Sequence, residues 1–113
     1  MYFDSHAHYD DESFDEDRYE LLEGMKAKGV DFIVNAAADM ASCLTGIALA
    51  KKYPFIYCSI GVHPHDVKSL KEEDLEEMRK LASYEKVVAI GEIGLDYYYD
   101  SSPREGQREW FKK

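Results

Sequence analysis

Short apolar segments and amphipathic segments alternate along the whole chain. The apolar segments are residues 2–4, 31–35, 55–60 and 86–90. Residues 55–60 combine β-branched and aromatic side chains, a composition typical of a buried strand. The pattern therefore predicts four β-strands, and the prediction of the first depends on the segments that follow it.

The segments between the strands carry apolar side chains at helical spacing. A helix is predicted over residues 15–28, with Gly29 as its stop, and its apolar face is formed by Leu21, Leu22 and Met25. A second helix is predicted from about Asp39 to the break at Tyr53-Pro54. It is expected to turn four side chains toward the core: Cys43, Leu44, Ile47 and Ala48.

Two further helices are predicted in the second half of the chain. The third follows a capping box of Ser69 and Glu72, and its apolar side chains are Leu75, Met78, Leu81 and Ala82. The fourth begins at Pro103 and carries Trp110 and Phe111. No glycine or proline stop follows it before Lys113, so we expect the chain to be the first part of a longer one.

The order β-α-β-α-β-α-β-α is typical of parallel strands joined by crossover helices. The fold class is therefore α/β. Two architectures fit: a small doubly wound sheet, or one half of a (β/α)8 TIM barrel, which needs roughly 250 residues when complete. The 113 residues are predicted to form a single domain, a (β/α)4 half barrel over residues 1–113.

Composition and charge narrow the classes of function. The formal net charge of −9 argues against an extended basic surface that grips phosphates. Bound cations can still reverse the local field in an acidic protein that acts on nucleic acid. No run of apolar residues is long enough to span a membrane, and no signal peptide is present, so we expect a cytoplasmic protein with no membrane partner. Cys43 and Cys58 are expected to be reduced thiols packed as small apolar groups.

Chemistry-bearing side chains gather at the predicted carboxyl ends of the strands. If the first strand continues, Asp4, His6 and His8 share one face, and two imidazoles there could reach one cation. The plainer alternative is one solvated histidine and one packing histidine, because a His-x-His spacing alone is weak evidence. Glu92, between Gly91 and Gly94, follows the fourth strand, where a carboxylate needs a counter-charge or a metal.

All four histidines of the chain lie just after strands one and three, because the segment GVHPH adds His63 and His65. This clustering is the strongest physical signal in the sequence. His65 is equally well explained as a stabiliser of its loop and as a catalytic residue.

These motifs resemble one known family. DSHAHYD, GVHPH and GEIGLDYYYD, followed by Gln107 and Trp110-Phe111, are together similar to the TatD-type metal-dependent deoxyribonucleases of the amidohydrolase-like barrels. The resemblance covers essentially the whole chain but only the N-terminal half of the family's barrel. His-x-His also occurs in unrelated hydrolases, whereas the GExGLD-type segment is much more specific.

The resemblance implies roles for individual residues. His6 and His8 would bind one divalent ion, Zn, Mn or Mg, and Glu92 would bridge it to a second ion or hold that second ion. His63 would lie near the scissile phosphate as a catalytic and substrate-binding residue. Asp4 and Asp10 would orient the imidazoles from behind, and Asp96 would shape the loop after Glu92.

The implied activity is metal-assisted hydrolysis of DNA phosphodiester bonds, in single strands or at a 3′ end. Tyr97 and its two neighbours would stack on unpaired bases, or else only pack the loop. Part of the family's metal site lies outside this chain. An inactive metal-binding or assembly half-domain, and a related barrel hydrolase of another ester or an amide, are therefore kept as alternatives. The unpaired edges of a half barrel also predict self-association.

Overall fold

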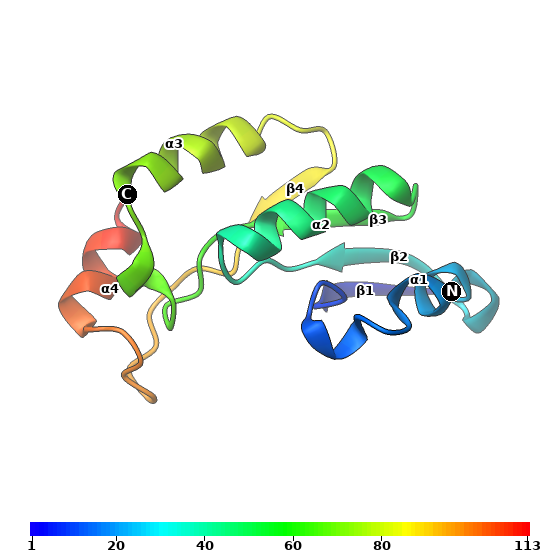
Figure 1. The fold of residues 1–113 in the computed structure, drawn as a ribbon, viewed down its shortest axis with the longest axis horizontal. Helices are drawn as coiled ribbons and strands as arrows, with labels where there is room; N and C mark the ends of the chain where they lie inside the picture. The colour runs from blue at the N-terminus through cyan, green and yellow to red at the C-terminus, as the bar shows by residue number, and fades with distance from the viewer.

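The computed structural model describes residues 1–113 and contains one four-stranded parallel sheet (Figure 1). Its strands are β1 (Tyr2–Ala7), β2 (Val30–Asn35), β3 (Ile56–Ile60) and β4 (Val87–Ile90). They lie in the order β1-β2-β3-β4, and each pairs in parallel with the next. The predicted α/β half barrel is thereby confirmed, and β1 extends through His6.

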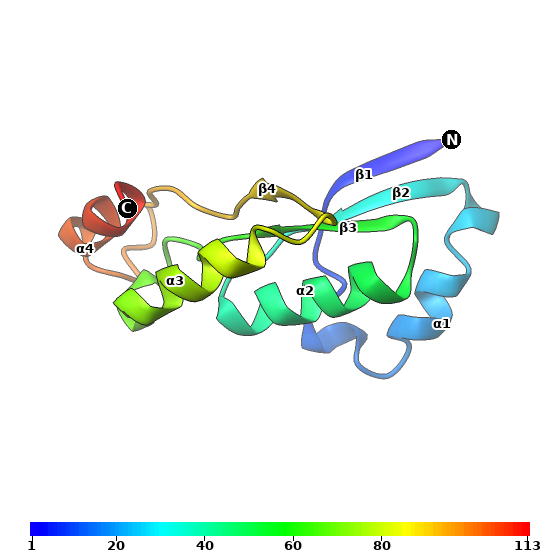
Figure 2. The same cartoon turned by 90° about the horizontal axis from the view of Figure 1, so that it is seen from above.

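Three of the four helices cover one face of this sheet. The helices are α1 (Arg18–Glu23), α2 (Met40–Lys52), α3 (Glu72–Leu81) and α4 (Arg104–Phe111), and three short 3-10 turns lie at Glu12–Phe14, Lys26–Lys28 and Val67–Ser69. Figure 2 shows α1, α2 and α3 on the same side of the strands, while α4 lies beyond the carboxyl end of β4. Every helix is too short or too polar to span a lipid bilayer.

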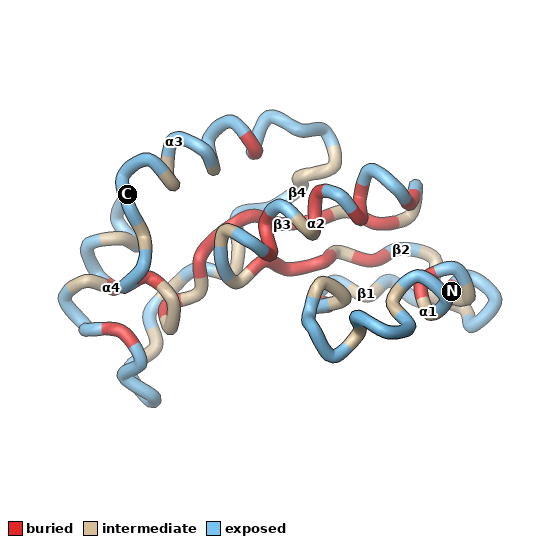
Figure 3. Tube along the Cα trace, viewed as in Figure 1, coloured by how far each residue is buried: buried red, intermediate tan, exposed pale blue.

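The core lies between the sheet and α2. Ile33, Ile56 and Cys58 of β2 and β3 are buried there against Cys43 and Ile47 of α2, and buried residues concentrate along these three elements in Figure 3. Burial raises the pKa of the Cys58 thiol to about 11 and also raises that of Cys43. Both thiols are free, as predicted for packed apolar groups.

The buried face of α2 differs from the prediction. Leu44 is 53% exposed and Ala48 is also exposed, whereas Gly46 lies against the sheet. A Cβ at Gly46 would lie 3.3 Å from the Asn35 side-chain amide and 3.5 Å from Cys58 Cβ. The helix approaches the sheet closely at Gly46, and Leu44 lies on the solvent side.

Two other local predictions are also corrected. The helix predicted over residues 15–28 is interrupted, because α1 ends at Glu23 with Gly24 as its cap and a 3-10 turn follows. Gly29 does end the segment, with a φ of 89°. At the start of α3 the carboxylate of Asp74 accepts the Lys71 N–H at 2.9 Å. The Ser69 hydroxyl instead donates to the Asp66 carbonyl, so Ser69 and Glu72 form no capping box.

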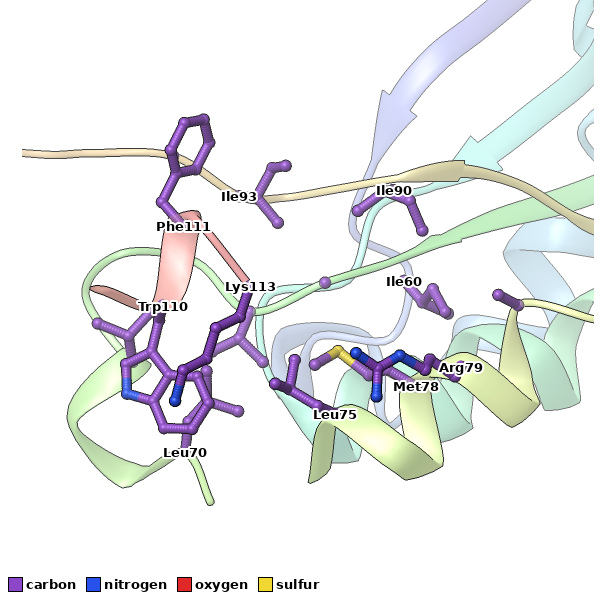
Figure 4. Close-up of a pocket in the computed structure, with 15 residues that line it drawn as sticks. Ile60, Leu70, Leu75, Met78, Arg79, Ile90, Ile93, Trp110, Phe111 and Lys113 are labelled. Carbon is purple, nitrogen blue, oxygen red and sulfur yellow. The ribbon is translucent and has the colours of Figure 1, made fainter. Parts of the chain in front are cut away.

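An apolar pocket of about 270 Å³ separates α3 and α4 from the ends of β3 and β4. Figure 4 shows Leu75 and Met78 of α3 on one side and Trp110 of α4 on the other. The histidines and Glu92 do not line it. The chemistry-bearing side chains lie elsewhere, at the carboxyl ends of the strands.

Candidate metal centre

His6 and His8 meet at the end of β1. Strand geometry turns Ala7 into the core and both histidines away from it. Their Nε2 atoms are 3.1 Å apart, and their side chains are 55% and 42% exposed. Two ring nitrogens therefore point toward one position that a solute can reach.

The ring of His8 is held by the backbone of the segment after β2. Its Nδ1 lies 2.9 Å from the carbonyl oxygen of Ala36, and the Ala36 N–H donates to the Ala7 carbonyl at 2.7 Å. Because a carbonyl oxygen only accepts, Nδ1 carries the proton. In the neutral ring, Nε2 of His8 therefore has a free lone pair, which is the form that binds a metal.

Glu92 is fixed by its own backbone and that of Gly91. Its N–H donates to the Ala37 carbonyl at 2.6 Å, and the Gly91 N–H donates to Ile60 at 2.8 Å. The buried Ser59 hydroxyl donates to the Gly91 carbonyl at 2.8 Å. These bonds join the ends of β2, β3 and β4, so the carboxylate has a defined position over the histidine pair.

Glu92 completes a triangle of ligand atoms with the two histidines. Its Oε2 lies 3.4 Å from His6 Nε2 and 3.3 Å from His8 Nε2. Neighbouring ligand atoms about 2.0–2.2 Å from one cation lie about 2.8–3.1 Å apart in octahedral coordination and about 3.3–3.6 Å apart in tetrahedral coordination. Two imidazoles and a carboxylate at this spacing therefore fit a divalent ion and leave positions open to water or substrate.

His63 faces the other oxygen of Glu92. Its Nε2 is 3.9 Å from Glu92 Oε1, and its Nδ1 accepts the backbone N–H of His65 at 3.1 Å. An Nδ1 that accepts is unprotonated, so the proton of the neutral ring is on Nε2. His63 therefore presents a hydrogen-bond donor at the edge of the centre.

His65 does not reach the centre. Its Nε2 is 2.5 Å from Asp96 Oδ2, and Asp96 Oδ1 accepts the N–H groups of Tyr98 and Tyr99 at 2.9 and 3.4 Å. The hydrogen bond from His65 and these N–H groups lower the pKa of the Asp96 carboxyl. Asp96 thus organises the loop after Glu92, and His65 connects that loop to the one after β3.

The expected contacts of Asp4 and Asp10 with the imidazole rings are absent. Asp4 Oδ1 accepts the backbone N–H of His6 at 3.2 Å. Asp10 Oδ1 accepts from the side-chain amide of Asn35 at 2.8 Å, and Asn35 in turn accepts the Tyr9 N–H at 2.8 Å. Asp4 therefore holds the backbone at His6, and Asp10 holds the Asn35 side chain that binds the backbone after His8. The Ala36 carbonyl orients the His8 ring in their place.

Tyr97 makes the contacts of the second of its two expected roles, packing of the loop. The guanidinium carbon of Arg104 lies 4.7 Å from the centre of its ring, and its hydroxyl accepts from Arg108 at 3.3 Å. The ring packs against α4, whereas Tyr98 and Tyr99 are more exposed.

Three groups around the centre carried no clear signal in the side-chain pattern. The carbonyls of Ala36 and Ala37 act through the backbone, which any residue supplies. Ser59 lies within an apolar strand, where its hydroxyl gave no indication of a partner. A polar residue inside a predicted buried strand must find a hydrogen bond, and that rule would have identified Ser59.

The fold and the site define one half of a βα barrel with a His-His-Glu cluster at the carboxyl ends of its strands. Residues 3–113 match the family described as "TatD related DNase". The chain belongs to this family.

Known proteins resemble the chain over nearly its full length. It is 44% identical to an uncharacterized metal-dependent hydrolase, YabD, of Bacillus subtilis (strain 168), over 99% of this chain and 44% of that protein. It is 36% identical to the 3′-5′ ssDNA/RNA exonuclease TatD of Cronobacter turicensis, over 84% of this chain and 36% of that protein.

A solved structure shows the same architecture. The crystal structure of YjjV, a TatD homolog from Escherichia coli K12, superposes with a TM-score of 0.87 at 30% identity, and the match covers 98% of this chain and 44% of that one. The chain therefore spans less than half the length of these relatives.

Proposed function

We propose that the chain contributes to a metal-dependent phosphodiesterase that hydrolyses nucleic acid from an end, with His6, His8 and Glu92 as ligands of a divalent ion. The triangle of ligand atoms, with edges of 3.1, 3.4 and 3.3 Å, carries this proposal. Imidazole nitrogen suits Zn²⁺ and its transition-metal neighbours better than Mg²⁺, so Zn²⁺ or Mn²⁺ is proposed for this position.

The ion would activate a water molecule and offset the charge that develops on the phosphate. Around it, His63 donates from Nε2 to a non-bridging phosphate oxygen. Glu92 uses Oε2 toward the histidine pair and keeps Oε1 available for a second cation or for the proton of the attacking water. A P–O bond forms from the water, which gives up a proton, and the P–O bond to the remaining strand breaks. The oxygen of that strand takes up a proton, and a nucleotide is released.

The substrate class rests on the relatives and on charge. In a protein of net charge −9, side-chain contacts with phosphate groups contribute little to the binding of nucleic acid. A bound cation supplies the positive charge that these contacts lack. A relative named as a 3′-5′ ssDNA/RNA exonuclease supports single-stranded nucleic acid as the substrate.

Calorimetric titration with Zn²⁺, Mn²⁺ and Mg²⁺ tests the centre, and release of nucleotides from a 5′-labelled single-stranded oligonucleotide tests the activity. Glu92→Gln should weaken metal binding by at least about 100-fold, the upper range for loss of an outer partner of a metal site. Glu76→Gln, on the exposed face of α3, is the matched control. Absence of metal binding would contradict the centre, and metal binding without turnover would favour a metal-binding half-domain.

A further inference from the structure

Two consecutive tyrosines project into solvent from the loop between β4 and α4. The side chains of Tyr98 and Tyr99 are 86% and 67% exposed, and their rings meet edge to face at 4.7 Å. This loop extends away from the rest of the molecule in Figure 1. Exposure of adjacent aromatic rings is unfavourable in water unless a ligand covers them.

The loop that displays these rings is firmly held. Gln107 of α4 is fully buried, donates to the Asp96 and Ser102 carbonyls at 3.0 and 2.8 Å, and accepts the Asp96 N–H at 2.8 Å. The Ser102 hydroxyl donates to the His65 carbonyl at 2.8 Å. Because the backbone is already ordered, a ligand of the tyrosines would lose little free energy to ordering of the loop.

A row of rings connects the tyrosines to the candidate metal centre. Tyr99 meets His65 edge to face at 5.5 Å, and His65 meets His63 at 4.2 Å between ring centres. His63 Nε2 is in turn 3.9 Å from Glu92 Oε1. A strand with one phosphodiester at the centre would therefore bring its neighbouring base toward Tyr99 and Tyr98.

Stacking suits this chain better than ionic contact does. With 14 basic and 23 acidic residues, the chain gains little from the release of counterions. Base–aromatic stacking is uncharged, tolerates every base, and is worth about 1–3 kcal/mol per base. The Tyr97 ring already packs against Arg104, but no arginine or lysine covers the rings of Tyr98 and Tyr99.

We propose that Tyr98 and Tyr99 form a stacking subsite for an unpaired base of single-stranded nucleic acid, next to the phosphodiester at the metal centre. The proposal deepens the proposed function and rests on it for the position of the phosphate. Tyr98 supplies the more open ring, and Tyr99 supports it from behind through contact with His65.

Binding of two hydrolysis-resistant oligomers tests the subsite separately from turnover. One is a fluorescein-labelled phosphorothioate octathymidylate, and the other has the same backbone with abasic residues. Fluorescence anisotropy with Mn²⁺ present should show at least about 10-fold tighter binding of the thymidylate by the wild-type chain, because 1.4 kcal/mol corresponds to a factor of ten. Tyr98→Ala should remove most of this preference, and Tyr98→Phe should keep it.

Tyr84→Ala is the matched control, since Tyr84 is 42% exposed and lies in the turn after α3. Equal affinity for the two oligomers, no binding of either, or a preference that survives Tyr98→Ala would overturn the subsite. A base preference in a chain that never cleaves would instead contradict the hydrolase and leave the subsite standing.

Discussion

The nitrogens of His8 and His63 differ in protonation because their hydrogen-bond partners differ. His8 Nδ1 faces a carbonyl oxygen and must donate, whereas His63 Nδ1 faces a backbone N–H and must accept. The first ring therefore offers a lone pair from Nε2 and the second offers a proton from Nε2. This difference suits His8 to bind a metal and His63 to donate a hydrogen bond to substrate.

Long-range ¹H–¹⁵N spectra of the histidine rings measure these tautomers directly. At a pH where the rings are neutral, we expect His8 as the Nδ1–H form and His63 as the Nε2–H form. Addition of Zn²⁺ should shift Nε2 of His6 and His8 strongly and that of His63 weakly. A metal-induced shift of His63 as large as that of His8 would make His63 a ligand and contradict its donor role.

The Asp96 carboxylate should make its loop sensitive to acid. Hydrogen bonds from His65, Tyr98 and Tyr99 hold its pKa below the ordinary value of 3.8. A pKa that is lower in the folded than in the unfolded state stabilises the fold fully above about pH 4, and this stabilisation is lost as the pH falls through the folded value. The Tm of the wild-type chain should therefore exceed that of Asp96→Asn near neutral pH, and the difference should disappear in acid.

Thermal unfolding of both chains between about pH 6 and pH 2.5 measures this effect. Asp100→Asn is the comparison: the pKa of Asp100 is also lowered, by Arg104 within the same segment, but Asp100 makes no contact with His65. A Tm difference between wild type and Asp96→Asn that persists unchanged in acid would show that the charge of Asp96 plays no part.

Where elements meet, the close approach of β3 to the end of β4 positions Glu92. A Cβ on Gly61 would lie 2.7 Å from the Gly91 carbonyl carbon and 2.9 Å from the Glu92 carbonyl oxygen. Both atoms belong to the backbone, which cannot move aside without carrying the carboxylate with it. Gly61→Ala should therefore lower the free energy of unfolding by about 1–3 kcal/mol, the usual cost of overpacking, and should also weaken metal binding.

Gly106→Ala is the matched control, because a Cβ there meets nothing within 4 Å and the residue lies inside α4. Helix propensity predicts that the free energy of unfolding of this variant is about 0.5–1 kcal/mol higher than that of the wild-type chain. Chemical denaturation of both variants measures the free energy of unfolding, and calorimetric titration measures their affinity for the metal. Unchanged metal affinity in Gly61→Ala would show that the contact serves stability alone.

The apolar pattern predicted the elements well because each strand is a short apolar run between turn residues. It misplaced the buried face of α2, since hydrophobicity favoured Leu44 whereas the packing used Gly46. Helix–sheet contact here depends on the absence of a side chain, which a hydrophobic pattern does not register. The interruption after Glu23 was not predicted for a related reason. Gly24 is compatible both with continuation of the helix and with a cap at its end.

The side chains of the centre were predictable, but the contacts that hold them were only partly so. His6, His8 and Glu92 converge because parallel strands place their carboxyl ends at one edge. The orientation of His8 comes from a carbonyl, and that of Glu92 comes from two backbone hydrogen bonds and the Ser59 hydroxyl. Backbone groups are the same in every residue, so no sequence pattern marks the ones that matter.

For the molecule as a whole, the sheet has one face without helices. Phe3, Phe32 and Tyr57 form a row of aromatic contacts across β1, β2 and β3, with ring centres 6.0 and 6.4 Å apart. Phe3 and Phe32 remain 58% and 40% exposed. In addition, β1 and β4 each pair with one neighbour only, so backbone groups at both edges are free to pair with another strand.

These features predict that the 113-residue chain associates with itself when studied alone. Sedimentation velocity over a range of concentrations should show a reversible increase in mass, because a second copy buries the aromatic row and pairs the edges. Phe32→Gln should shift the association to higher concentration. Leu44→Gln removes an apolar residue of similar exposure from the solvent side of α2 and should not shift it. A wild-type chain that sediments as a monomer at every concentration would show that its net charge of −9 outweighs the attraction of the uncovered face.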